Sequence, residues 1–160
     1  MLIQVDTREK SSQTKRIFEH FDNQGVQYLS KKLDVGDYMS FSNVHVAIDR
    51  KQSIGEYAVN MGADHARFKR EMLRANENGI KLIFLIEDDK IKSIDDVKKW
   101  WNPNSIFHSR YMTGEMLYKG MKTQISRYGV EFHFCNKEET GYKIVELLKE
   151  NGGWYVVRRK

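Results

Sequence analysis

The run Lys81–Glu87 (KLIFLIE) is the feature that most constrains how this chain can fold. It holds five consecutive aliphatic or aromatic residues, with no alternation between polar and apolar positions. Such a run is typical of a strand that is buried on both faces of a sheet. We therefore expect a central strand here, inside a sheet that helices cover.

Turn signals and cap residues divide the rest of the chain into shorter elements. We expect extended segments at 2–6, 26–33, 36–41, 44–51 and 130–135, and helices at 12–23, 54–78, 93–101, 113–128 and 138–151. Antiparallel strands thus come first, and strands alternating with helices follow. This order predicts an α/β fold with a central mixed sheet flanked by helices. With 160 residues and no linker or repeat, the chain is expected to form a single domain over 1–160.

Charge and cysteine content limit the possible partners and sites. The 27 basic and 22 acidic side chains give a net charge of +5, which favours an anionic partner such as nucleic acid, although many cytosolic proteins are also basic. Cys135 is the only cysteine, so an intramolecular disulfide and a cysteine-based zinc site are excluded. No Walker-type glycine loop occurs, which argues against nucleotide hydrolysis. The lack of a signal peptide or a long apolar run predicts a cytoplasmic protein with no membrane partner.

Acidic residues gather at the ends of the expected strands. Asp6 ends the first strand, Asp37 opens the hairpin, and Asp49 lies two residues before Lys51. Carboxylates at such places are costly to bury unless they bind cations or hydrogen-bond donors. Several converging carboxylates suit Mg²⁺ or Mn²⁺. Because strand side chains alternate, Lys51 would share a face with Asp49 and could orient an attacking water or steady phosphate charge.

Taken singly, these segments also have plainer interpretations. Asp6–Glu9 could be a polar turn that caps a helix, and Asp49–Lys51 could be a solvated edge strand. The basic residues Arg67, Arg70 and Arg74 fall on one helical stripe, which fits either phosphate contacts or a solvated face. The ordered combination of these segments is what favours a nuclease.

The hairpin sets a geometric condition on this hypothesis. A two-residue turn at Ser42-Asn43 would place Asp37 opposite Ile48, and Asp37 would then face away from Asp49. A shared metal site needs the two carboxylates on one face. The hypothesis therefore predicts an odd loop length or a bulge, with Gly36 as the expected place.

Five motifs occur in an order that resembles one known family. They are Val5-Asp6-Thr7-Arg8-Glu9, Leu33-Asp34-Val35-Gly36-Asp37-Tyr38, Ile48-Asp49-Arg50-Lys51-Gln52-Ser53, Arg67-Phe68 and Leu82-Ile83-Phe84-Leu85-Ile86-Glu87. Together they resemble the nuclease domain of the XPF-type structure-specific endonucleases, which have a restriction-endonuclease-like fold. The resemblance implies an endodeoxyribonuclease dependent on Mg²⁺ or Mn²⁺. Its substrate would be branched, flapped or junction DNA, in repair or recombination.

The same resemblance implies a role for each matching residue. The metal ligands would be Asp37, Asp49 and Asp6. The catalytic set would comprise Asp37, Asp49, Lys51, Glu9 and Arg50. The DNA contacts would come from Arg8 and Arg67, which match motif positions, and from Arg70, which shares the helical stripe of Arg67.

The chain departs from the family pattern at three places. Asp49 stands where the family usually has Glu, and Gly55 stands where it usually has an acid; Glu56, one residue later, either replaces that acid or is irrelevant. No helix-hairpin-helix module follows before Lys160, so a stand-alone phage or bacterial enzyme is expected, with a homodimer through the C-terminal half. A catalytically silent DNA-binding subunit and a protein-interaction subunit on the same fold remain the alternatives.

Overall fold

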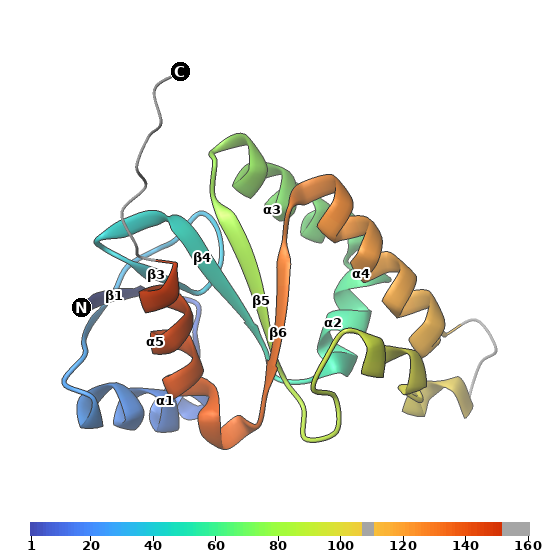
Figure 1. Ribbon diagram of the computed structural model, residues 1–160, viewed down its shortest axis with the longest axis horizontal. Coiled ribbons are helices and arrows are strands. Elements are labelled where there is room, and N and C mark those ends of the chain that lie inside the picture. The colour runs from blue at the N-terminus through green and yellow to red at the C-terminus, as the bar shows by residue number, and fades with distance from the viewer. Residues whose placement is uncertain (107–110, 152–160) are drawn as a thin grey trace.

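A mixed sheet forms the centre of the protein (Figure 1). The computed structural model describes residues 1–106 and 111–151. In these residues the sheet has six strands in the order β2-β1-β3-β4-β5-β6. The strands are β1 (Leu2–Val5), β2 (Gln27–Ser30), β3 (Tyr38–Ser40), β4 (Asn43–Lys51), β5 (Lys81–Glu87) and β6 (Glu131–Cys135). Strand β3 pairs antiparallel with β1 and β4, whereas β1–β2, β4–β5 and β5–β6 are parallel.

Helices cover both faces of this sheet, as the sequence predicts. One face carries α1 (Ser11–Asn23) and α5 (Thr140–Glu150), and the other carries α2 (Ile54–Met61), α3 (His65–Glu77) and α4 (Gly114–Tyr128). Strand β5 faces both layers: Ile83 and Leu85 lie in the core with α1 and α5, while Leu82, Phe84 and Ile86 lie in the core with α2, α3 and α4. The buried run therefore forms the central strand expected of it. No helix in the described part of the chain is both long and apolar enough to cross a bilayer.

Several expected elements have different bounds. The single helix expected over 54–78 is wrong: α2 ends at Met61 and is followed by Gly62, and α3 begins at His65. Glycine weakens a helix because its backbone loses the most conformational freedom. The helix expected over 93–101 is a 3₁₀ turn, η1 (Asp95–Lys99); two further 3₁₀ turns are η2 (Pro103–Ile106) and η3 (Lys137–Glu139). The extended segment expected at 26–33 contains only the short β2.

The hairpin of β3 and β4 is irregular, which confirms the geometric condition set by the sequence. Tyr38 lies opposite Ile48 and Met39 opposite Ala47, but the next residue of β3, Ser40, lies opposite Asn43. Strand β4 thus advances four positions while β3 advances one. Continuing the first part of this register by one residue brings position 37 opposite position 49, on a shared face. The irregularity lies between Met39 and Ser40, so Gly36 was the wrong place to expect it.

Gly36 has a different task in the same hairpin. Its φ is +69°, which side-chain-bearing residues rarely adopt. A Cβ atom at this position would lie 2.9 Å from the carbonyl oxygen of Ile48. Glycine therefore lets the backbone just before Asp37 lie directly against β4.

Candidate active site

A polar hollow of about 430 Å³ lies beside the paired ends of β3 and β4, with α2 and α3 as its other wall. Five acids line it: Glu9, Asp34, Asp37, Asp49 and Glu71. Five cations line it as well: Arg8, Lys51, Arg67, Arg70 and Arg74. Most of the residues predicted for catalysis or DNA contact are therefore brought together, although they come from segments far apart in the sequence.

Asp37 and Asp49 are the two carboxylates that the hairpin presents to this hollow. Asp37 Oδ2 accepts a hydrogen bond of 2.8 Å from the backbone N–H of Arg50, which fixes its position against β4. Burial, followed by the negative charges of Asp49 and Glu9, raises the pKa of Asp37 well above its usual range. Burial likewise raises the pKa of Asp49 to about 6, against the opposing charge of Lys51. Both carboxyls therefore lack sufficient positive charge around them.

Lys51 shares the face of Asp49, as strand alternation predicts. Its Nζ lies 2.7 Å from Asp49 Oδ1 and 5.5 Å from the centre of the Phe68 ring. Burial disfavours the ammonium form, but the charges of Asp49 and Asp37 outweigh it, and the pKa of Lys51 is raised. Lys51 therefore stays protonated at neutral pH and acts as a fixed cation beside the two carboxylates.

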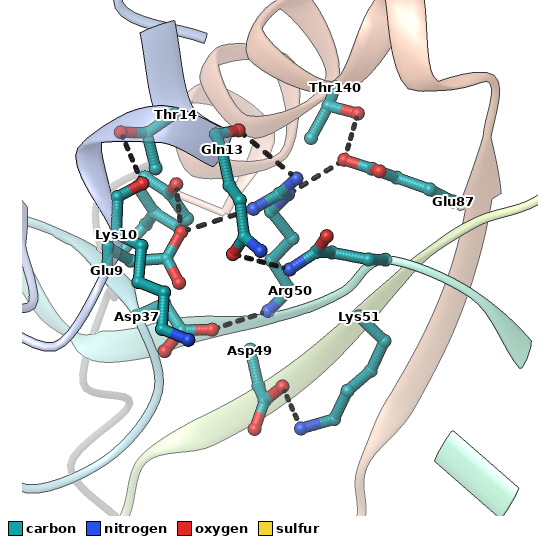
Figure 2. Close-up of polar contacts among 12 residues, drawn as sticks. Glu9, Lys10, Gln13, Thr14, Asp37, Asp49, Arg50, Lys51, Glu87 and Thr140 are labelled. Atoms are coloured by element: carbon teal, nitrogen blue, oxygen red, sulfur yellow. Dashed lines mark hydrogen bonds and ion pairs between the residues drawn. The ribbon is translucent and has the colours of Figure 1, made fainter. Parts of the chain in front are cut away.

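Arg50 points to the opposite face of β4, away from Asp49 and Lys51 (Figure 2). Its Nε donates to Glu87 Oε1 at 2.7 Å, and Thr140 Oγ1 donates to the same oxygen at 2.8 Å. This ion pair joins β4, β5 and α5 in the interior of the protein, and both of its side chains are almost fully buried. Sequence reasoning missed Glu87 and Thr140, because only the sheet register brings these residues together.

Glu9 connects this interior network to the hollow. Its Oε2 accepts a 2.7 Å hydrogen bond from the Tyr38 hydroxyl and lies 3.4 Å from Arg50 Nη1. Glu9 also lines the hollow. Arg50 is thus placed to position Glu9 and does not itself line the hollow.

Asp6 lies outside the hollow and is almost fully buried. Its carboxylate accepts hydrogen bonds from the backbone N–H, Nε and Nη2 of Arg8 and from the backbone N–H of Leu33. Burial alone would raise the pKa of Asp6, but these donors outweigh it and the pKa is lowered. In this arrangement Asp6 orients Arg8, which lines the hollow, and a metal-ligand role for Asp6 would require releasing four hydrogen bonds.

The arginines of α3 form the outer part of the hollow. Arg67 Nη2 lies 3.5 Å from Asp64 Oδ2, and Arg74 Nη1 donates to the backbone oxygen of Asp34 at 2.9 Å. Arg70 is exposed and has no hydrogen bond or ion pair with any described residue. It is therefore the cation of this stripe that is most available to an anionic ligand.

Sequence reasoning missed two further residues of the hollow, Glu71 and Asn60. Glu71 lies one turn after Arg67 on α3, so helical spacing from the Arg67-Phe68 motif could have located it. Asn60 comes from α2, and its buried Oδ1 accepts no hydrogen bond from the described residues. With the chain broken between α2 and α3, a side chain from each helix lines the hollow beside the acids of β4.

The carboxylate oxygens of the hollow are suitable ligands for a hard divalent cation. Asp49 Oδ1 is buried and, apart from its ion pair with Lys51, accepts no hydrogen bond from a described residue. Carboxylate oxygens are the ligands that Mg²⁺ and Mn²⁺ prefer. Within residues 1–106 and 111–151, no three His, Cys, Asp or Glu side chains already stand at metal-binding spacing. Asp37 and Asp49 are therefore the pair that could first hold such an ion.

Comparisons with known proteins bear on this geometry. The family model described as the ERCC4 domain matches residues 5–148. No curated protein matches the sequence. Among solved structures, XPF from Aeropyrum pernix aligns with a TM-score of 0.68 and 19% identity, over 96% of this chain and 66% of that chain. XPF from Aeropyrum pernix in complex with DNA aligns with a TM-score of 0.65 and 20% identity, over 94% and 64%.

The protein thus spans just under two thirds of the XPF chains that it matches. At this level of identity the structures establish a common fold, which confirms the expected restriction-endonuclease-like architecture and the resemblance to XPF. The family match runs through the hairpin, the hollow and both covering layers of the sheet. From residue 5 to residue 148, this chain belongs to the ERCC4 domain family.

Proposed function

We propose that this protein is a divalent-metal-dependent endodeoxyribonuclease that hydrolyses phosphodiester bonds. The observation that carries the proposal is the pair Asp37 and Asp49, held on one face by an irregular hairpin beside a buried lysine. Burial and mutual repulsion leave this pair in need of positive charge. Asp37 and Asp49 would hold Mg²⁺ or Mn²⁺.

Each part of the hollow has a task in this reaction. When bound, the cation would stabilise negative charge on the phosphate and lower the pKa of an attacking water. Lys51 stays protonated beside Asp49 and orients the water or the phosphate oxygen. Glu9, held by Tyr38 and Arg50, adds a further acceptor on the strand side. Asp6 holds Arg8 at the entrance of the hollow, where a phosphate would enter.

DNA is the substrate that fits the surrounding charge. Arg67 and Arg70 lie on the stripe of α3 that lines the hollow, and the chain carries a net charge of +5. Arginine contacts to phosphates supply most of the sequence-independent affinity for DNA. XPF from Aeropyrum pernix, which shares this fold, has been solved in complex with DNA. We extend the proposal to branched, flapped or junction DNA, in repair or recombination, on the family resemblance.

The test is cleavage of nicked, flapped and Holliday-type DNA with and without Mg²⁺ or Mn²⁺. We expect cutting that requires the metal and that is lost in Asp37→Ala and in Asp49→Ala. Metal-dependent cutting that survives both substitutions would show that the active site lies elsewhere. A homodimer through the C-terminal half is a separate proposal, and sedimentation of the free protein tests it.

A catalytically silent DNA-binding subunit is the second candidate. Two observations favour it. Among the described residues, no third acid stands at metal-binding distance from the pair, and Gly55, where the family usually has an acid, has no side chain. This candidate predicts salt-sensitive DNA binding without cleavage under any divalent metal. Loss of DNA binding at low salt would instead favour a protein-interaction subunit.

A further inference from the structure

The site described so far has two carboxylates on the hairpin, and Glu9, the further acid on the strand side, is held by Tyr38 and Arg50. Gly55, at the position where an acid would follow Lys51, has no side chain. Its neighbour Glu56 is occupied at the start of α2: its N–H donates to Ser53 Oγ at 3.0 Å, and its Oε2 accepts from Gln52 N–H at 2.7 Å. Glu56 is exposed and lines a different hollow. The segment after β4 therefore supplies no third acid.

Glu71 approaches the same place from the opposite wall. It is half-buried on α3 and lines the hollow together with Asp37 and Asp49. Its charge raises the pKa of Asp49 more than the charge of Glu56 does. Phe68, one turn earlier on α3, lies beneath the ammonium of Lys51. Helix α3 is thus packed against β4 beside Lys51.

Only one oxygen of Glu71 is occupied. Oε1 accepts a 3.0 Å hydrogen bond from the backbone N–H of Gly36, the residue before Asp37. Oε2 has no partner among the described residues. The nearby Asn60 Oδ1 is also buried without a donor, and Asp49, 4% exposed, has its Oδ1 contacted only by Lys51. Glu71 Oε2 and Asn60 Oδ1 therefore lack donors, and Asp49 Oδ1 has only Lys51, so the hollow offers oxygen ligands to a cation.

We propose that Glu71 takes the place of the missing acid, so that α3 supplies the third carboxylate serving the divalent cation at Asp37 and Asp49. This inference rests on the proposed metal-dependent function. Because Mg²⁺ and Mn²⁺ keep several waters, the carboxylate of Glu71 can act on the ion or on its water shell. The bond to Gly36 also ties the third acid to the loop that places Asp37.

The decisive variant is Glu71→Gln, assayed by Mn²⁺ binding in the absence of DNA. Glutamine keeps an oxygen that can accept from Gly36 N–H and removes only the charge. We expect its dissociation constant for Mn²⁺, measured by electron paramagnetic resonance, to rise at least about 10-fold, with an unchanged unfolding temperature in metal-free buffer. Glu56→Gln is the matched control and is expected to bind Mn²⁺ like the unaltered protein.

Further variants separate this inference from the proposed function. If Asp37→Asn loses Mn²⁺ while Glu71→Gln binds it as the unaltered protein does, the role of Glu71 is refuted and the metal site stands. If Glu71→Ala loses Mn²⁺ but Glu71→Gln does not, Glu71 only holds the loop at Gly36, and the inference is again refuted. If the unaltered protein binds no Mn²⁺ at millimolar concentration, both proposals are refuted.

Discussion

Raising the pH of the metal-free protein from 5 to 7.5 removes the proton of the buried Asp49 carboxyl, which lies beside a second buried carboxyl, Asp37. The pKa of each is raised in the folded state, chiefly by burial. A raised folded pKa gives stability that is fully present below the unfolded pKa and is lost as pH rises through the folded value. We therefore expect the metal-free protein to become less stable over this interval.

The magnitude follows from Asp49, whose pKa rises from 3.8 to about 6. Two pKa units correspond to about 3 kcal/mol between full protonation and full ionisation. Between pH 5 and pH 7.5, roughly 1 to 2 kcal/mol of this is lost. Asp37 adds a change of the same sign. The lowered pKa values of Asp6 and Glu131 have their effect on the acid side of this interval.

Urea unfolding at a series of pH values, with a chelator present, measures this loss directly. Saturating Mg²⁺ at pH 7.5 should restore the stability, because the cation binds only the folded, ionised pair. Asp49→Asn should flatten the pH dependence. A metal-free protein that is as stable at pH 7.5 as at pH 5, or more stable, would refute the claim that these carboxyls lack compensating charge.

Three further predictions concern the surroundings of the site. Arg50→Met leaves the buried Glu87 with Thr140 but without its cationic partner, and should lower the free energy of unfolding by about 3 to 5 kcal/mol. A loss below about 1 kcal/mol in urea would contradict this network. Gly36→Ala would place an alanine at a φ of +69°, with its Cβ 2.9 Å from a backbone oxygen of β4. It should therefore lower the free energy of unfolding by more than about 1 kcal/mol and reduce cleavage. An unchanged urea midpoint would contradict this. Arg70→Ala should weaken DNA binding and reduce the slope of log affinity against log salt by about 1. Arg127→Ala, on α4, is the control and should leave both the affinity and the slope unchanged. Equal effects of the two variants would contradict the claim that DNA contacts Arg70 beside the hollow.

The sequence was sufficient to predict those features that depend on local pattern. The unbroken apolar run 82–86 predicts the central strand, and the alternation along β4 places Asp49 and Lys51 on one face. The same alternation implies that Arg50 points the other way, yet the motif match placed all three residues in one catalytic set. The structure separates them, with Arg50 acting through Glu9.

What the sequence could not supply are the features set by packing between distant segments. The need for an irregular hairpin followed from the two carboxylates, but its location between Met39 and Ser40 depends on how β3 pairs with both neighbours. The break at Gly62 was hidden because the residues on both sides favour helix, and that break directs α3 toward the hollow. Helical spacing from Arg67 could have marked Glu71, but its place beside the acids of β4 depends on how α3 returns to the sheet.

The Arg8–Asp6 pair shows how one motif can have a local and a functional meaning together. Asp6 accepts from the backbone N–H of Arg8 in the turn that follows β1, but α1 begins only at Ser11 and no side chain caps it, so the expectation of a helix cap is wrong. It also orients the guanidinium of Arg8 toward the hollow, where the nuclease interpretation needs a cation. The polar turn of Asp6–Glu9 is therefore compatible with the nuclease interpretation, although it caps no helix.

The central claim is that Asp37 and Asp49 hold a divalent cation at the hollow. Crystals of the protein soaked in Mn²⁺, with an anomalous difference map calculated at the manganese edge, test it most directly. The account predicts one peak in the hollow, about 2 Å from an oxygen of Asp37 and from an oxygen of Asp49. A map with no peak there, or with manganese bound only at other acids of the surface, would contradict it.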